Sequence, residues 1–315
     1  FRQWLVKVLL SLIDRRKMVD RSMKGVFPIL STPTNRKGQT VLDDLKKQVE
    51  WMIENGVHGV GIAIASEIYK YSEEERDEIL KTVVEQSNGR IKVVMNTGAE
   101  SSNLAIHYSK RAIDLGADAL MIRPASFIPT PANDQINYFV DIAENVTVPI
   151  FLQDQGTAPV TPSMAIECAK RHENLCYIKV ETPPTIPRMT EISEAKSKSD
   201  IIVFGGAGGA FCVEEFKRGS VGTMPGSTMP DIWVEIWKSF SSGDVQEAQD
   251  LQDKFTPIIK ILAQTQGLAP WIYKYVMVKR GVFDSNSGYV RGPSLKPDDL
   301  HLREIDKVLE NLELV

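Results

Sequence analysis

Eight short apolar runs, each followed by polar or glycine-rich residues and then by a stretch with helical periodicity, dominate the chain from residue 25 to about residue 240. The runs show little alternation, which is typical of parallel strands that are buried on both faces. Eight such units in roughly 200 residues match a TIM (β/α)8 barrel, whereas a doubly wound sheet usually has fewer strands. We therefore predict a TIM barrel. The runs lie at residues 26–30, 60–64, 91–95, 119–122, 149–152, 176–180, 201–204 and 221–224.

The stretches between the runs carry helix start and stop signals. Residues 42–53 have apolar side chains three and four positions apart, and Asn55-Gly56 then supplies a C-terminal cap. Ser72 and the three glutamates after it form a capping box. Residues 101–115 repeat the pattern before a further glycine. These signals predict a helix after each of the first three runs.

Beyond residue 240 the pattern is entirely helical. We expect a TIM-barrel domain over residues 24–240 and a C-terminal helical domain over residues 241–315. Residues 1–23 are expected to be an N-terminal extension, as a helix that docks on the barrel or has no role in it. A signal peptide is the alternative, but no A-x-A-like cleavage site precedes Met18. The C-terminal amphipathic stretches lie at residues 245–262, 268–278 and 297–314.

Composition and charge exclude several classes of protein. With 37 basic and 41 acidic side chains the formal net charge is −4, so the chain lacks the basic excess that nucleic-acid binding requires. No apolar run reaches the ~18 residues of a membrane-spanning helix. The three cysteines lack metal-type spacing and the four histidines form no H-x-x-x-H pair, which argues against a disulfide framework and a zinc site. We expect a cytoplasmic enzyme without a metal, a nucleic-acid partner or a membrane contact.

Lys179 is the most informative residue at a strand end, where the active site of a TIM barrel lies. It falls within the run 176–180, whose two faces should both be covered. Burial would lower the pKa of its amine and make the amine a nucleophile for a carbonyl carbon. A lysine that reaches solvent or pairs with a carboxylate is an equally good interpretation from position alone.

Other strand ends offer candidates with two interpretations each. Glu67 could act as an acid or base, but holding a loop by hydrogen bonds is the favoured interpretation. Ser66 could bind a substrate carboxylate or be an ordinary loop hydroxyl. Asp154 could be a base or a structural partner of the next loop. Residues 205–209 are glycine-rich but lack the P-loop motif, so we expect them to let a substrate approach the backbone rather than bind phosphate.

Short motifs follow one another in a fixed order from residue 25 to the C-terminal region. They are Gly25-Val26-Phe27-Pro28, Thr32-Pro33, Gly38, Asp43-Asp44, Glu50-Trp51, Gly56-Val57-His58-Gly59, Ser66-Glu67, Ser72 to Arg76, Gly116-Ala117-Asp118-Ala119, Tyr177-Ile178-Lys179, Gly222 and Gly243-Asp244. In this order and spacing the chain resembles the dihydrodipicolinate synthase / N-acetylneuraminate lyase family of class I aldolases. The resemblance implies a TIM barrel with a C-terminal helical domain and a homo-oligomer, as a tetramer or dimer. It also implies a Schiff base between Lys179 and a 2-keto acid.

The sequence departs from the family's pattern at four places. Residues 64–67 read Ile-Ala-Ser-Glu where Thr-Thr-Gly-Glu is usual, so both threonines are missing. Gln153 replaces the usual tyrosine at the end of the fifth strand, and residues 125–127 read Ala-Ser-Phe in place of Tyr-Tyr-Asn. The short loop after Asp154 also lacks the arginine that marks dihydrodipicolinate synthases proper. A role in lysine biosynthesis is therefore not expected.

Residues 66–67, 153–154 and 179–183 look like a subgroup of the family, the 2-keto-3-deoxy-pentonate (L-arabonate type) dehydratases. This resemblance implies an imine at Lys179, loss of a C3 proton to give an enamine, and elimination of the C4 hydroxyl. Gln153 cannot titrate and could only orient water or substrate. The group that moves the protons stays open among Ser66, Asp154, Glu181 and a substrate hydroxyl.

We therefore expect a lyase that dehydrates a 2-keto-3-deoxy sugar acid or cleaves it in a retro-aldol reaction. The alternatives are pyruvate condensation of the dihydrodipicolinate synthase type and a catalytically silent 2-keto-acid binding protein. No cofactor beyond the covalent lysine imine is expected. The expected catalytic residues are Lys179, Gln153 and Asp154, and the expected substrate-binding residues are Ala65, Ser66, Glu67, Ser126, Glu181, Gly206 and Met224.

Overall fold

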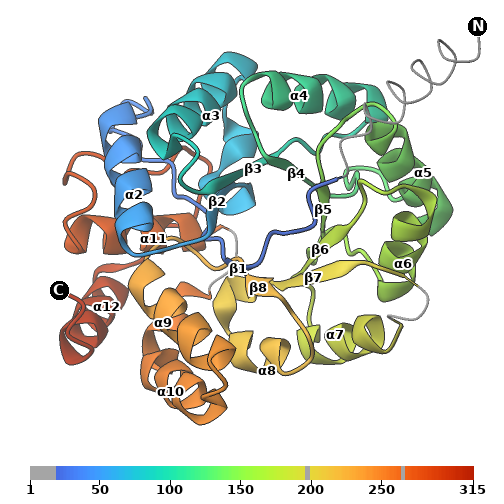
Figure 1. Ribbon diagram of the computed structural model, residues 1–315. Coiled ribbons are helices and arrows are strands. Elements are labelled where there is room, and N and C mark those ends of the chain that lie inside the picture. The colour runs from blue at the N-terminus through green and yellow to red at the C-terminus, as the bar shows by residue number, and fades with distance from the viewer. Residues whose placement is uncertain (1–18, 196–198, 264–266) are drawn as a thin grey trace, which may run out of the picture.

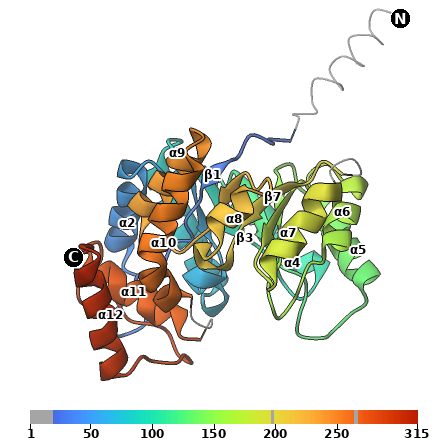
Figure 2. The same ribbon diagram turned by 90° about the horizontal axis from the view of Figure 1, so that it is seen from below.

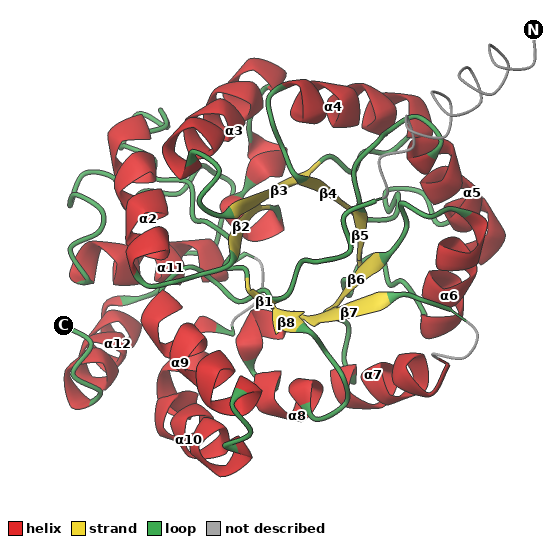
Figure 3. Ribbon diagram, in the orientation of Figure 1, coloured by secondary structure: helices red, strands yellow, loops and turns green. Residues whose placement is uncertain are grey.

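Eight parallel strands form a barrel at the centre of the molecule (Figures 1 and 3). The computed structural model describes residues 19–195, 199–263 and 267–315, so the expected N-terminal extension lies outside the described residues except for its last five. Strands β2 to β8 pair in chain order, and β8 pairs with β1. A parallel bridge between Ile29 and Gly61 links the β1 end of the sheet to β2. The strands are β1 (Gly25–Val26), β2 (Gly59–Ile62), β3 (Lys92–Asn96), β4 (Ala119–Ile122), β5 (Ile150–Gln153), β6 (Tyr177–Val180), β7 (Ile202–Gly205) and β8 (Gly222–Thr223).

Helices surround the barrel and continue into a C-terminal group on one flank, beside α2 and α9 (Figures 1 and 2). The barrel helices are α2 (Leu42–Glu54), α3 (Glu73–Ser87), α4 (Ser102–Asp114), α5 (Ala132–Ala143), α6 (Pro162–Arg171), α7 (Thr185–Glu194), α8 (Cys212–Phe216) and α9 (Pro230–Ser241). The C-terminal group is α10 (Val245–Leu262), α11 (Ala269–Lys279) and α12 (Asp299–Asn311). No helix in the described part of the chain is both long and apolar enough to span a membrane. This architecture confirms the predicted TIM barrel with C-terminal helices.

Most elements have the bounds that the sequence indicates. Helix α2 covers residues 42–54, and Ser72 and Glu75 form the predicted capping box of α3. The first and last strands are shorter than predicted, with two residues each. The reason is that Pro28 and Pro225 follow them and have no backbone N–H to continue the ladder.

Aromatic side chains fill the end of the barrel where the strands begin. The rings of Phe151 and Tyr177 stack with centroids 4.5 Å apart, and Phe204 meets both of them edge-on. Met23 is buried below them, and its backbone N–H donates to the Tyr177 hydroxyl at 3.1 Å. Met23 thus packs as part of the barrel, one residue before the expected domain boundary. The space for a ligand lies at the opposite end, where the strands finish.

Candidate active site

A cavity of about 1200 Å³ opens at the C-terminal ends of the strands. The loops after most strands line it, and α11 of the C-terminal group adds Tyr273. Four of the charged side chains on its wall form two ion pairs, Lys179 with Glu181 and Arg123 with Glu100. A concave site with a few convergent polar groups is the usual form of a small-molecule site. The predicted residues Ala65, Ser126 and Met224 also line this cavity.

Lys179 and Glu181 meet on the cavity wall. The Lys179 side chain is 4% exposed, and its Nζ lies 2.9 Å from Glu181 Oε1. The buried lysine is thus paired with a carboxylate on the wall of the cavity. Gln153, opposite Lys179 on β5, donates to Glu181 Oε2 at 3.2 Å and accepts from Asn96 Nδ2 at 2.8 Å. This chain of hydrogen bonds fixes the carboxylate beside the amine and assigns Gln153 a positioning role.

Gly206 makes room for Glu181. A Cβ atom at this position would overlap the Glu181 side chain, so the close approach requires glycine. The predicted role of Gly206 in the substrate site is therefore indirect in this structure, through the carboxylate that it lets in.

Asp154 anchors two loops and is fully buried. Its carboxylate accepts hydrogen bonds from the backbone N–H of Val160 at 2.9 Å and from both the N–H and the hydroxyl of Thr182. The Arg188 guanidinium also donates to it at 3.0 Å. These donors occupy both carboxylate oxygens, so the geometry assigns Asp154 to the structural partner role rather than to that of a base in the cavity.

Ser66 and Glu67 hold the loop after β2 through contacts with other parts of the protein. The Ser66 hydroxyl donates to the carbonyl of Leu30 and accepts from the N–H of Ala63. Glu67 is buried with a left-handed backbone, φ 59°, and its carboxylate pairs with Lys274 at 2.6 Å and with a second lysine. Both side chains make their hydrogen bonds and ion pairs within the protein. These contacts agree with the loop-holding roles that were among the alternatives.

A family model described as the dihydrodipicolinate synthetase family matches residues 22–312. The chain belongs to this family. The resemblance predicted from the motifs is thereby confirmed. As a member of the dihydrodipicolinate synthetase family, the chain is a lyase of the class I, Schiff-base aldolase type. Family members act on small keto acids and are typically oligomeric.

Individual relatives in the family cover almost the whole chain. An L-2-keto-3-deoxyarabonate dehydratase of Azospirillum brasilense is 26% identical over 87% of this chain and 90% of its own length. A 4-hydroxy-tetrahydrodipicolinate synthase of Methanocaldococcus jannaschii is 27% identical over 93% of this chain and 99% of its own. The crystal structure of a dihydrodipicolinate synthase from Rhodopseudomonas palustris has the same fold, with a TM-score of 0.84, 24% identity and coverage of 91% of this chain and 97% of that one.

Three residues that were not predicted to belong to the site lie in or beside the cavity of this family member. Asn96 holds Gln153, and its place at the end of the third run is a signal that could have identified it. Arg76 reaches the wall from α3, and Tyr273 from α11. Nothing in their local sequence indicates a site, because tertiary packing alone brings these helices to the strand ends.

Glu215 on α8 is a buried carboxyl close to the site. Its side chain fits against β7 because Gly205 has no Cβ, which would overlap the Glu215 carboxyl. Neither carboxyl oxygen has a hydrogen-bond partner among the described residues. Burial, followed by the negative charges of Glu214 and Glu181, raises the pKa of Glu215 to about 8. The folded protein therefore holds Glu215 protonated at neutral pH.

Replacing Glu215 by glutamine is expected to remove a pH dependence of stability. Between the ordinary glutamate pKa of 4.5 and the folded pKa of about 8, the folded state holds a proton that the unfolded state lacks. The unfolding free energy of the natural chain therefore falls as the pH rises through this window. Between pH 5 and pH 8, the unfolding free energy of the natural chain should fall by about 2 kcal/mol or more relative to that of Glu215→Gln. Urea unfolding of both proteins at pH 5 and pH 8 measures this change. The same difference in unfolding free energy between the two proteins at both pH values would contradict the prediction.

Proposed function

We propose that this family member is a Schiff-base lyase for a 2-keto-3-deoxy sugar acid, acting as a dehydratase or as a retro-aldolase. The observation that carries the proposal is the Lys179–Glu181 pair, 2.9 Å apart on the cavity wall. A lysine supplies the imine, and the adjacent carboxylate supplies a base at hydrogen-bond distance. We also expect a homo-oligomer, as is typical of the family.

The first step of the proposed reaction joins Lys179 to the substrate. Glu181 takes a proton from the Lys179 ammonium, and the free amine attacks C2 of the keto acid. Loss of water from the carbinolamine gives the iminium ion. The iminium is an electron sink for the neighbouring carbon, so the proposal needs no metal or other cofactor.

The second step differs between the two reactions. The dehydratase breaks a C3–H bond and the C4–O bond, whereas the retro-aldolase breaks the C3–C4 bond. In the dehydratase, a base removes a C3 proton to give an enamine, and the C4 hydroxyl then leaves as water. In the retro-aldolase, the C4 hydroxyl loses a proton and the C3–C4 bond breaks, which gives an aldehyde and the enamine of pyruvate. Glu181 is the acid–base group proposed here, because its carboxylate faces Lys179, whereas Asp154 is occupied by loop donors.

Two observations favour dehydration over a synthase reaction. The relative from Azospirillum brasilense is named as an L-2-keto-3-deoxyarabonate dehydratase. At the end of β5 this chain has Gln153, which cannot exchange a proton. The synthase from Methanocaldococcus jannaschii is a relative of similar identity, so condensation of pyruvate is the second candidate, but the departures at residues 64–67 and 125–127 argue against it.

Borohydride reduction in the presence of pyruvate tests the imine. We expect a stable mass adduct on Lys179 in the natural chain and none at that position in Lys179→Ala, because the alanine variant has no amine there. Lys238→Ala removes an exposed lysine of α9 and serves as the matched control, which should keep the adduct. Failure to trap any 2-keto acid would show that the Schiff-base proposal is wrong.

A product assay separates the forms of the proposed reaction. With 2-keto-3-deoxy pentonates, a dehydratase releases 2-ketoglutarate semialdehyde, whereas an aldolase releases pyruvate and an aldehyde. An adduct without turnover of any substrate in a panel of sugar acids would favour the catalytically silent binding protein.

A further inference from the structure

Two hydrogen bonds and an ion pair connect Asn96 on β3 to Lys179 on β6. Asn96 Nδ2 donates to Gln153 Oε1 at 2.8 Å, and Gln153 Nε2 donates to Glu181 Oε2 at 3.2 Å. Glu181 Oε1 lies 2.9 Å from Lys179 Nζ. The two oxygens of Glu181 therefore have different partners, because Oε2 faces an amide and Oε1 faces the amine.

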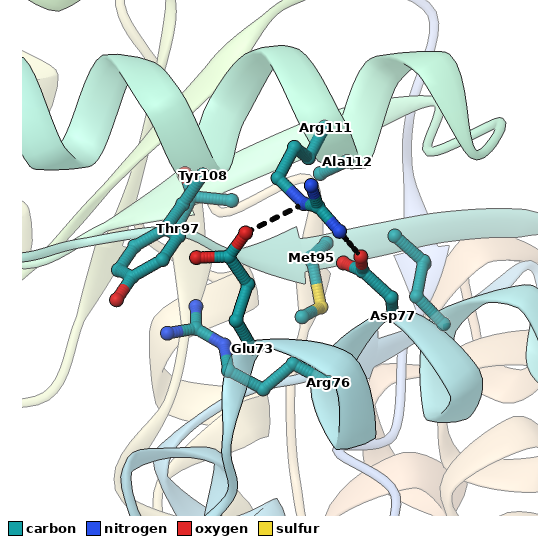
Figure 4. A pocket seen from close by; sticks show the side chains of 9 residues that line it. Glu73, Arg76, Asp77, Met95, Thr97, Tyr108, Arg111 and Ala112 are labelled. Carbon is teal, nitrogen blue, oxygen red and sulfur yellow. Dashed lines mark hydrogen bonds and ion pairs between the residues drawn. The ribbon is translucent and has the colours of Figure 1, made fainter.

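Asn96 is a well-fixed starting point for this row of contacts. The residue is 3% exposed, lies at the end of β3 and is paired in the sheet with Met121 on β4. Its backbone carbonyl accepts a hydrogen bond from the Arg76 guanidinium at 2.9 Å. Figure 4 shows this guanidinium beside the Tyr108 ring, and its Cζ lies 4.3 Å from the centre of that ring. The sheet and α3 together hold Asn96 against Gln153.

The direction of the Gln153 amide decides which oxygen of Glu181 can carry a proton. An amide nitrogen only donates hydrogen bonds, and an amide oxygen only accepts them. With Nε2 turned to Glu181, Oε2 must accept, so a proton that Glu181 takes up is carried by Oε1, beside Lys179. A reversed amide would present its oxygen to Glu181 and draw the proton to Oε2, away from the amine.

Asn96 provides the contact that opposes this reversal. While Glu181 is ionised, its carboxylate attracts Nε2 of Gln153 by itself. A protonated carboxyl group can both accept and donate, so the direction of the amide is then fixed at its other end. There Asn96 presents a donor, which pairs with Oε1 of Gln153 and would meet the donor Nε2 of a reversed amide.

We propose that Asn96 is a positioning residue that, through Gln153, keeps the exchangeable proton of Glu181 on Oε1, the oxygen that faces Lys179. The inference rests on the proposed function, since it takes Glu181 as the group that moves protons of the imine. When the C3–H bond breaks, its electron pair forms the C2=C3 bond of the enamine and the imine π electrons move to nitrogen. The proton goes to Oε1 of Glu181, and in the retro-aldolase it returns from there to C3 of the pyruvate enamine.

Exchange of the methyl hydrogens of pyruvate for deuterium tests this transfer without knowledge of the natural substrate. In D2O, a pyruvate imine at Lys179 that loses a C3 proton and regains a deuteron becomes labelled. Proton NMR measures the rate after subtraction of the exchange without protein. Borohydride trapping on the same preparation gives the yield of the imine. We expect the natural chain both to exchange deuterium and to be trapped.

Variants of Asn96 separate the direction of the amide from packing. Asn96→Asp keeps the shape of the side chain but replaces its donor by an acceptor, which reverses the Gln153 amide. It should slow exchange roughly 10- to 100-fold, the effect of one hydrogen bond to a charged group, and leave the final yield of trapped pyruvate within about twofold. Asn96→Leu has neither donor nor acceptor and should slow exchange less, because the amide can then adopt either direction. Asn145→Asp makes the same change at an exposed residue after α5 and should keep the natural rate.

A double-variant cycle shows whether Asn96 acts through Gln153. Gln153→Met removes the amide and keeps a side chain of similar length, and it should slow exchange about tenfold. In this background Asn96→Asp should have no further effect, because there is no amide to reverse. An equal loss in both backgrounds would mean that the aspartate acts by its charge or by a change in packing, and it would refute the positioning role.

The outcomes separate this inference from the proposed function. If pyruvate is trapped but the natural chain exchanges no deuterium, or if Asn96→Asp exchanges as fast as the natural chain, the positioning role is refuted and the imine at Lys179 stands. If no keto acid is trapped at Lys179, the proposed function itself fails, and the inference fails with it.

Discussion

Replacing Glu181 by glutamine is expected to lower kcat by roughly 10²–10⁴-fold, the usual contribution of a positioned acid–base group. Glutamine has nearly the same shape and can still occupy the space that Gly206 leaves, but it cannot take a proton from Lys179 or from the substrate. The imine with pyruvate should still be trapped, but more slowly, because Lys179 is intact and has lost the base that deprotonates it. The test is to measure borohydride trapping and turnover of the sugar acid on the same preparation.

Glu100→Gln is the matched control for this experiment. Glu100 is also a carboxylate on the cavity wall, but it is bound to Arg123 and to the backbone N–H groups of Ser126 and Phe127. Its loss should change kcat less than tenfold, because the group does not face Lys179. Equal losses of kcat in the two variants would show that cavity charge in general, and not proton transfer by Glu181, sets the rate.

The barrel could be predicted from the sequence because its cause is local. Each strand must be buried on both faces and each helix on one, so the apolar pattern alternates along the whole chain. The same logic places Lys179 within the buried strand β6, and Glu181, the first residue after that strand, follows two positions later and lies on the same side. The strand and the residue after it therefore present both members of the central pair, and a sequence can reveal that.

The remainder of the site depends on contacts between distant segments. Asp154 directly follows its strand as a catalytic base would, but Val160 and Thr182 from two loops and Arg188 from α7 converge on it. A carboxylate that holds loops and one that awaits a substrate have the same sequence context. Such partner choices are set by tertiary packing and leave no periodic signal.

The ion pair between Glu67 and Lys274 joins the barrel to the C-terminal helices. Lys274 on α11 is fully buried, with its Nζ 2.6 Å from Glu67 Oε2 and 2.8 Å from the carbonyl of Tyr289. Glu67 sits in the loop whose Ala65 lines the cavity, and its left-handed backbone is unfavourable for a residue with a side chain. The pair thus holds a strained loop at the edge of the active site.

Lys274→Met is expected to destabilise the protein by roughly 3–5 kcal/mol, because it leaves the Glu67 carboxylate buried without its closest partner. The double variant Glu67→Gln/Lys274→Met removes both charges and should recover most of that loss, since a buried pair contributes little beyond its own desolvation. Arg171→Met breaks an exposed ion pair with Glu167 and should lower stability by no more than about 1 kcal/mol. Urea unfolding of the three variants measures these differences. Additive losses in the double variant would contradict the prediction, because they would mean that the two charges stabilise the fold independently of each other.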